Sequence, residues 1–412
     1  MTWDVDYLRD NRDENMGFLS KTLLPDGTEI PGTNFDYNYL QHRKVDVVSS
    51  ALDFILPFEK YKITAGAKVS FTNTRNGINY DTSDPTLVQD DYFRYKEQIY
   101  ALYADYSREF SERFSMQLGL RMEHTRTTGI SEAKDTEDKH DYTRLFPTVY
   151  LLYSPTDGHA LNFSFSNRIS RPSQNMVNPF PFYQNKYTYA CGREDLKPSY
   201  TYNAELGYTL KNNFNVSAYY SYSDDVFFQV VDLDAETNVT SFLWENFMQT
   251  HAFGLNNSYT FRTKWLQAYA QHGVSYRRTT SSAATTSPEE KGWLMTPVCA
   301  TLSSSMKRRL FCHVVRFLFF PSVSGIYLMS PTYSVSAGML YRLLDNKLNL
   351  SLNVNNLFVS HSKLETMSNG LKIIADNQFS FTSFRIGVSY TFGGDIRSKG
   401  QRNSNEDIQR RL

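Results

Sequence analysis

The sequence predicts an all-β fold, a partial transmembrane antiparallel β-barrel of about 14–16 strands. Three observations lead to this prediction. Apolar and polar residues alternate along nearly the whole chain, as expected for strands with one apolar and one wet face. Aromatic residues make up 15% of the chain and gather near the expected strand ends. Short and long connections alternate between consecutive strands, as in barrels with short periplasmic turns and long extracellular loops.

The clearest strand lies close to the C-terminus, at residues 384–392. Its even positions are all apolar or aromatic, whereas its odd positions are small, polar or charged: Phe384, Ile386, Val388, Tyr390 and Phe392 against Arg385, Gly387, Ser389 and Thr391. The mean hydropathy of the chain is nevertheless polar, at -0.48. A barrel with a wet lumen explains both the apolar face of this strand and the polar mean hydropathy, because only every second residue of its strands is apolar. A soluble propeller fits less well, because its strands would bury both faces.

The chain divides into three parts. Residues 1–44 show little periodicity and are predicted to form an irregular loop or a frayed first strand. Residues 45–393 form the predicted outer-membrane β-barrel domain, and residues 394–412 form a charged periplasmic tail. The strands are expected at 45–56, 61–71, 93–110, 114–123, 142–153, 161–170, 200–210, 214–222, 241–261, 265–280, 292–306, 310–327, 333–344, 347–358 and 377–392.

The connections between these strands predict the topology. Short turns are expected near 57, 112, 156, 212, 263, 308 and 345, and long connections near 85, 135, 185, 235, 285 and 365. The connection near 330 is of intermediate length. Residues 131–141 are expected to be a charged loop, and residues 172–198 form the longest connection of the first half. Because short and long connections alternate, the end of the final strand is expected on the side of the short turns, which is the periplasmic side.

Bulk properties exclude several classes of protein. A formal net charge of +0 and a pI near 7.1 give no reason to expect nucleic acid as a partner. No apolar run is long enough for a transmembrane helix.

The N-terminus has neither a basic region nor an apolar core, so it is not a signal peptide. We therefore expect the chain to be a fragment of a longer precursor, lacking a plug domain and a signal peptide.

The alternation fails between residues 303 and 320, where apolar residues occupy both faces. Arg316 lies in this stretch and must point inward or lie near an interface, because a lipid-facing arginine at the midplane costs about 2–4 kcal/mol. Two interpretations stay open. The inner face of this strand packs against another element, such as a plug, or the coding frame slipped locally. Resequencing the locus would decide between them.

No catalytic, cofactor-binding or metal site is predicted, and no ligand-binding residue can be assigned. The chain lacks the common catalytic and phosphate-binding motifs, so we do not expect an enzyme. The three cysteines have no metal-ligand spacing. Two acidic pairs, Asp224 with Asp225 and Asp232 with Asp234, could suggest a hard-cation site, although loop acids are usually only solvated. Three histidines are expected at the surface or in the lumen: His124, His140 and His159.

Charged residues on the wet faces are better candidates for function. The alternation directs eight of them into the lumen: Lys62, Lys68, Arg121, Glu123, Arg168, Glu205, Arg342 and Arg385. There they would solvate the lumen and pair with one another or with a plug. Four aromatic residues near strand ends are predicted to form interfacial girdles: Tyr153, Tyr208, Trp265 and Tyr390.

One stretch carries a family resemblance. The segments 167–172 (NRISRP), 178–180 (NPF), 196–200 (LKPSY) and 205–208 (ELGY) resemble the barrel of TonB-dependent receptors, most closely the outer-membrane β-barrel family common in Bacteroidota. Residues 321–338 and 354–358 are similar to later parts of that barrel. The sequence departs from the family at 190–193 (ACGR) and at Asn355 and Asn356, and nothing in it resembles a plug or a TonB box.

The resemblance implies an outer-membrane location and a role in transport. Such receptors take up nutrients too large for porins: an iron chelate, a cofactor, an oligosaccharide or a peptide. The implied partners are outer-membrane lipid, a plug domain, the TonB energy-transducing complex and, as a further candidate, a surface lipoprotein. Two alternatives stay open, a passive porin-like channel and a structural or adhesive outer-membrane barrel.

Overall fold

The computed structural model describes the whole chain except residues 84–89, 306–308, 361, 378–381, 393–407, 409–410 and 412; side chains are also left aside at 301–305. In the described part, strands dominate and one short helix is found, α1 (Gln174–Val177). None of the described helical residues forms a helix long and apolar enough to cross a membrane.

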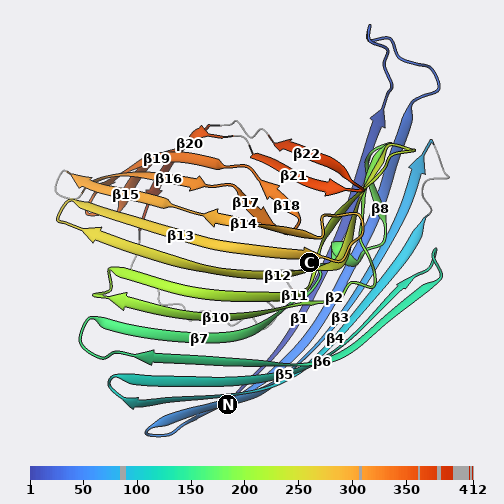
Figure 1. The fold of residues 1–412 in the computed structure, drawn as a ribbon. Coiled ribbons are helices and arrows are strands. Elements are labelled where there is room, and N and C mark those ends of the chain that lie inside the picture. The colour runs from blue at the N-terminus through green and yellow to red at the C-terminus, as the bar shows by residue number, and fades with distance from the viewer. Residues whose placement is uncertain are drawn as a thin grey trace.

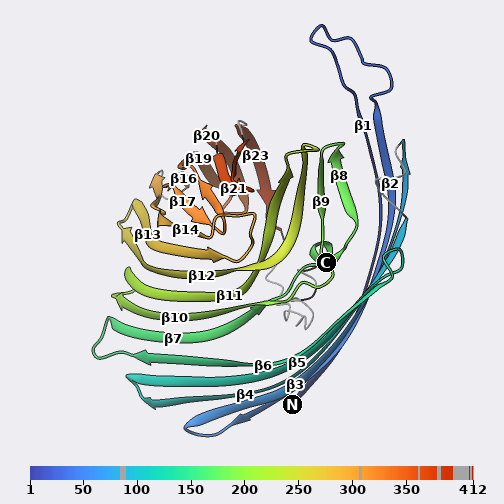
Figure 2. The same ribbon diagram turned by 45° about the vertical axis from the view of Figure 1, so that its right-hand side comes forward.

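The strands follow one another around a strongly curved sheet (Figures 1 and 2). Their bounds are β1 (Thr2–Ser20), β2 (Phe35–Pro57), β3 (Tyr61–Thr82), β4 (Asp91–Ser111), β5 (Phe114–Ser131), β6 (Thr136–Tyr153), β7 (His159–Ser170), β8 (Pro181–Asn185), β9 (Thr188–Cys191), β10 (Ser199–Leu210), β11 (Phe214–Asp234), β12 (Val239–Arg262), β13 (Leu266–Ser281), β14 (Glu289–Met295), β15 (Val298–Ser305), β16 (Leu310–Phe319), β17 (Ser322–Ser324), β18 (Tyr327–Met329), β19 (Thr332–Leu343), β20 (Leu348–Val359), β21 (Ser362–Ser368), β22 (Leu371–Asn377) and β23 (Ser383–Tyr390).

The main sheet contains 19 of the described strands, and β17, β18, β21 and β22 form a separate sheet of four. Consecutive strands pair antiparallel from β1 to β7, and β7 pairs with β10. Antiparallel pairing continues from β10 to β13, and then through β15, β16, β19 and β20 to β23. Both β14 and β15 pair with β13, so we count them as one interrupted strand, and we leave out the short strands β8 and β9. The meander then has sixteen strands. The predicted antiparallel barrel fold of about 14–16 strands is confirmed.

The meander of sixteen described strands has an unpaired edge at each of its two ends. β1 pairs only with β2, and β23 pairs only with β20. Backbone groups at an edge have no hydrogen-bond partner in hydrocarbon, and each unsatisfied group costs several kcal/mol. The described strands therefore form a trough and not a closed cylinder, as Figure 2 shows.

Several strands are longer than the alternation predicted. The expected charged loop at 131–141 is wrong, because β5 and β6 continue through it and pair up to Ser131 and Thr136. The N-terminal stretch likewise holds the regular strand β1, paired with β2 along its whole length. Residues 9–15 and 131–141 have polar residues on both faces, so a search for apolar alternation misses them. The start of β1 is different, because Trp3, Val5 and Tyr7 are exposed apolar residues that alternate with Asp4 and Asp6.

The faces of the sheet agree with the predicted alternation. On β5, Leu118, Leu120 and Met122 are exposed on the convex outer face. The residues between them point into the trough, where Glu123 is only 4% exposed. Residues that are paired across strands lie on the same face of the sheet. Leu120 is paired with Ala104 on the outer face, and Glu123 is paired with Ala101 and Arg144 on the inner face.

The irregular stretch near 303–320 differs from the prediction in two ways. The strand expected at 310–327 ends at Phe319, because Pro321 and a turn at Gly325 (φ +61°) start the separate hairpin of β17 and β18. The strand expected at 292–306 is interrupted at Pro297. Arg316 pairs with Val335 and Cys299 on the outer face, close to the end of β16. Arg316 therefore does not point inward, and it lies three residues before the end of β16.

Candidate functional site on the lumen wall

The inner wall of β2 to β7 forms a cavity of about 710 Å³ whose lining mixes charged and apolar side chains. Lys68, Arg121, Glu123 and Arg168 line this cavity, as the alternation predicted. Lys62 lines a second cavity of about 800 Å³ near the short turns, and Glu205 lines a smaller recess. The register places the other two predicted lumen charges opposite asparagines, Arg342 beside Asn349 and Arg385 beside Asn353.

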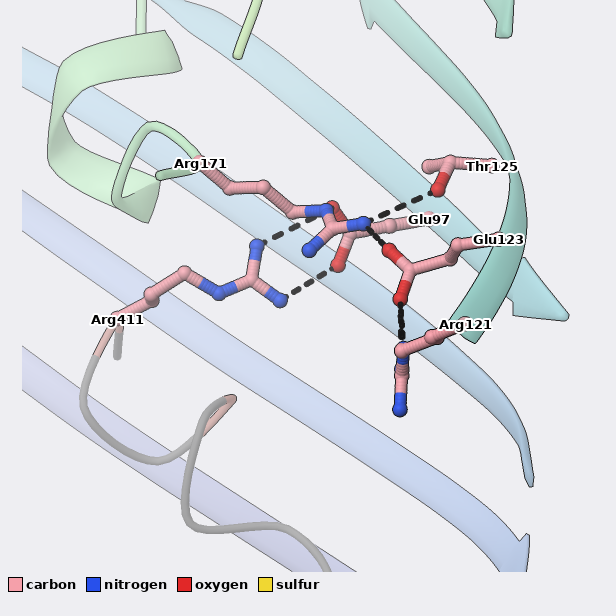
Figure 3. A network of polar contacts seen from close by, with 6 residues as sticks. All are labelled: Glu97, Arg121, Glu123, Thr125, Arg171 and Arg411. Atoms are coloured by element: carbon pink, nitrogen blue, oxygen red, sulfur yellow. Dashed lines mark hydrogen bonds and ion pairs between the residues drawn. The ribbon is translucent and has the colours of Figure 1, made fainter. Parts of the chain in front are cut away.

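An ionic cluster lies at the upper edge of the first cavity, formed by Glu97, Arg121, Glu123, Thr125, Arg171 and Arg411 (Figure 3). Arg171, directly after β7, reaches between two carboxylates. Its guanidinium binds Glu123 and donates a hydrogen bond to the Thr125 hydroxyl at 3.2 Å, with the Glu97 carboxylate at 3.9 Å. Arg121 binds Glu123 from below at 2.6 Å.

The cluster is buried, although it lies on the wet side of the sheet. The side chains of Glu97 and Glu123 are 3% and 4% exposed, and that of Arg171 is 10% exposed. Buried charges are tolerated only when paired and hydrogen-bonded, because desolvation costs several kcal/mol per ion. Three guanidinium groups around two carboxylates meet this requirement. The arrangement holds β4, β5 and the end of β7 together on the lumen side.

The connection between β7 and β10 folds into the trough. We call residues 172–198, which contain α1, β8 and β9, the inward loop. Its residues Val177, Phe180 and Leu196 are buried against the upper inner faces of β2 to β4, in a cluster that includes Phe35, Tyr37, Tyr39, Ile78, Phe93 and Tyr95. The hydroxyl of Tyr37 donates a hydrogen bond to the Pro181 carbonyl at 2.9 Å, and that of Tyr80 does so at 3.3 Å. The loop therefore continues the core of this side of the barrel.

The inward loop is also attached to the opposite wall. β9 pairs in parallel with the start of β12, from Thr188 with Thr240 to Cys191 with Leu243. The guanidinium of Arg193 binds Glu245 at 2.9 Å. Asn246 accepts a hydrogen bond from the Lys197 amide at 2.8 Å and donates one to its carbonyl at 2.9 Å. The loop thus spans the trough from β2–β4 to β12, as Figure 2 shows.

The acidic pairs considered for a cation site are engaged in local structure. Asp225 forms a bulge in β11 with φ 51°, and Asp224 accepts a hydrogen bond from Gln249 at 3.0 Å. Asp232 accepts one from Asn369 at 2.8 Å. Asp234 binds the Thr237 hydroxyl at 2.6 Å, and this hydrogen bond lowers the pKa of its carboxyl. No group of three metal-ligating side chains is found in the described part of the chain.

The histidines and cysteines have ordinary surroundings. His124 interacts with the Thr143 hydroxyl at 2.9 Å and His159 with the Tyr208 hydroxyl at 2.7 Å, whereas His140 lies on the extended part of β6. The three cysteines are free. Cys191 is partly buried in β9, its thiol donates a weak hydrogen bond to the Pro179 carbonyl at 3.1 Å, and burial raises the pKa of this thiol.

Sequence reasoning missed three central residues of the site: Glu97, Tyr37 and Arg411. Glu97 lies on the inward parity of β4, between Tyr95 and Ile99, and this parity could have identified it. Tyr37 lies in a stretch taken as irregular, and Arg411 lies in a tail that carries no pattern. The resemblance gave a better signal, because the segments 167–172 and 178–180 contain Arg171 and the buried Phe180.

The comparison with known families agrees with this architecture. The model of the outer membrane protein beta-barrel family matches residues 1–390. The chain belongs to that family. This outer-membrane barrel is therefore located in the outer membrane, as the sequence predicted. No curated protein sequence matches it.

Solved structures similar to this chain include two receptors and a transporter. The ferripyoverdine receptor of Pseudomonas aeruginosa matches with 15% identity and a TM-score of 0.57, over 94% of this chain and 54% of the receptor. The ferric yersiniabactin uptake receptor FyuA from Yersinia pestis matches with 14% identity and a TM-score of 0.58, over 91% and 57%. The ferric citrate transporter FecA matches with 12% identity and a TM-score of 0.58, over 95% and 61%. The chain thus spans little more than half the length of these receptors.

Proposed function

We propose that this chain is the barrel portion of a TonB-dependent receptor that imports a nutrient too large for porins. The observation that carries the proposal is a polar, charge-lined lumen wall in a barrel of the outer-membrane family. The similar structures support it, since they are an uptake receptor, a transporter and a receptor for iron chelates. The cargo belongs to the class of iron chelates, cofactors, oligosaccharides or peptides, and no bond chemistry is involved.

In this proposal the chain contributes three functions. The long hairpins and the separate sheet of β17, β18, β21 and β22 capture the cargo outside the membrane. The polar wall of β3 to β7 offers hydrogen-bonding groups along the path through the lumen. A plug domain closes the lumen until energy from the TonB complex displaces it.

The inward loop favours an energised receptor over a passive channel. It crosses the trough between β2–β4 and β12, and its aromatic residues are packed tightly against the wall. A passive channel selects by the free width of its lumen. A fixed element across the mouth reduces that width for every solute, whereas a receptor that moves its plug needs only a path beside the loop.

Uptake measurements would test the proposal. Cells that carry the complete gene should accumulate the cargo, and deletion of either the gene or TonB should abolish accumulation. A porin would instead continue to admit small solutes without TonB. The nucleotides upstream of Met1 give an independent check. An in-frame plug and signal peptide support the receptor, whereas a stop codon with a ribosome-binding site directly before Met1 would contradict it.

A further inference from the structure

Two residues of the C-terminal tail lie against the inner wall of the barrel. Ile408 and Arg411 are one helical turn apart, with a hydrogen bond from the Arg411 amide to the Ile408 carbonyl at 2.9 Å. Residues three apart on a turn project to the same side. Ile408 is 2% exposed, and Arg411 reaches Glu97 in the ionic cluster (Figure 3). These contacts lie far from the end of β23, which lies beside the turn at residues 344–347.

The contact with Glu97 has the geometry of a specific recognition site. Arg411 binds the Glu97 carboxylate through both terminal nitrogens, at 3.1 and 2.7 Å, which is the bidentate arrangement of strong arginine–carboxylate pairs. In the described part of the chain, both hydrogen bonds to this carboxylate come from Arg411. The nearest other guanidinium, that of Arg171, is 3.9 Å away. A buried carboxylate of this kind needs such a partner.

Ile408 packs against an apolar part of the lumen wall that is separate from the ionic cluster. Val45 and Val47 are fully buried inward-facing residues of β2, and together with Ile408 they form a separate apolar cluster. Apolar side chains are unexpected on a wet lumen face. The backbone of Arg411 adds a third contact, because its carbonyl accepts a hydrogen bond from the Gln174 amide of the inward loop at 3.2 Å.

We propose that Val45, Val47 and Glu97 form a binding site for the C-terminal tail of this same chain, with Ile408 in the apolar part and Arg411 in the acidic part. Ile408 and Arg411 are thereby held on the lumen side of the sheet, against β2, β4 and the inward loop. This proposal does not depend on which solute the barrel transports, or on whether transport is energised.

Cysteine cross-linking in native outer membranes would test the site. The three native cysteines are replaced by serine, and Val47→Cys is combined with Ile408→Cys. Oxidation should cross-link this pair in most of the folded protein and shift its mobility in non-reducing gels. Val48→Cys with Ile408→Cys is the matched control, because Val48 is adjacent but points to the outer face with 46% exposure. It should react at least about fivefold more slowly, since a disulfide requires close Cβ atoms.

A second pair of variants tests the charge. Arg411→Glu should slow the cross-linking of the Val47 pair severalfold, whereas Arg168→Glu, with the same change in net charge at an exposed position of the same lumen wall, should leave it unchanged. Heat modifiability in gels shows that each variant is folded. The site is overturned if folded protein does not cross-link through Val47, if the Val48 pair reacts equally fast, or if both charge variants have the same effect.

Discussion

At the scale of single residues, Arg171 holds the lumen wall together. Its side chain lies between Glu97 and Glu123, both buried. Arg171→Ala would remove one of the two guanidinium partners of Glu123, while Arg121 and Arg411 still bind the two carboxylates. Because a hydrogen bond to a charged group contributes about 1.5–3 kcal/mol, we expect a loss of that size. We expect a correspondingly lower urea midpoint for the loss of the folded, heat-modifiable form.

Arg168→Ala provides the control for this prediction. Arg168 belongs to the same sequence segment and lines the same cavity, but its side chain is exposed. Its removal should change the midpoint little, because exposed charges contribute at most about 1 kcal/mol. If Arg168→Ala destabilised the barrel as much as Arg171→Ala, burial of the cluster would not be the source of its stability.

How far the sequence predicts the site differs from residue to residue. Alternation places Arg121 and Glu123 on the lumen wall, because one period of two residues decides the face. It does not predict that Glu123 is buried, since this follows from Arg171 and the inward loop, which come from other parts of the chain. It also gives no information about Arg411, whose partner Glu97 is distant in sequence.

At the scale of elements, the inward loop depends on the packing of Phe180. This side chain is 1% exposed and contacts the ring of Phe93 edge-on, with centroids 6.5 Å apart. Phe180→Ala should cost about 3–5 kcal/mol of local packing and raise the population of a detached loop. Cys191 is a native reporter of that state, because its thiol is partly buried and burial raises its pKa.

The measurement is the rate of maleimide labelling of Cys191, with Cys299 and Cys312 replaced by serine. Phe180→Ala should accelerate labelling severalfold. Tyr187→Ala, at an exposed position of the same loop, should not. Equal acceleration by both variants would show that the reporter senses the loop in general and not its aromatic anchor.

Extended hairpins are the elements that sequence patterns predict least well. Beyond the apolar band, β5, β6, β11 and β12 have water on both faces, so hydrophobic alternation no longer marks them. Their hydrogen-bonded registers continue nevertheless, up to short turns at residues 132–135 and 235–238. Strands such as β4, β7 and β10 were predicted close to their observed bounds, because their apolar residues alternate regularly.

At the scale of the whole molecule, the two faces of the sheet should respond oppositely to charge. Leu206 is 57% exposed on the outer face of β10, and its neighbour Glu205 points inward at the same depth. Leu206→Arg should cost about 2–4 kcal/mol near the midplane and reduce folded protein in outer membranes. Glu205→Arg should be tolerated. Equal loss for both variants would contradict the assignment of faces.

The orientation of the barrel gives another prediction. An epitope inserted in the turn at residues 235–238 should be accessible to antibody on intact cells, because long hairpins face outward. The same epitope in the turn at residues 211–213 should be detected only after the outer membrane is permeabilised. Both insertions lie in turns with positive φ, at Asn238 and Asn212, so their local disturbance is comparable. Detection of the second epitope alone on intact cells would reverse the orientation.

The attachment of the inward loop to two walls has a mechanical consequence. A curved sheet bends easily about axes parallel to its strands, since only side-chain packing resists a change of curvature. A segment that joins β2 and β3 to β12 across the concave side converts such bending into tension along itself. A force applied inside the lumen would then be carried by the hydrogen bonds between β9 and β12 and by the Arg193–Glu245 ion pair, all at the same time. The rim of the trough would then change shape as one unit.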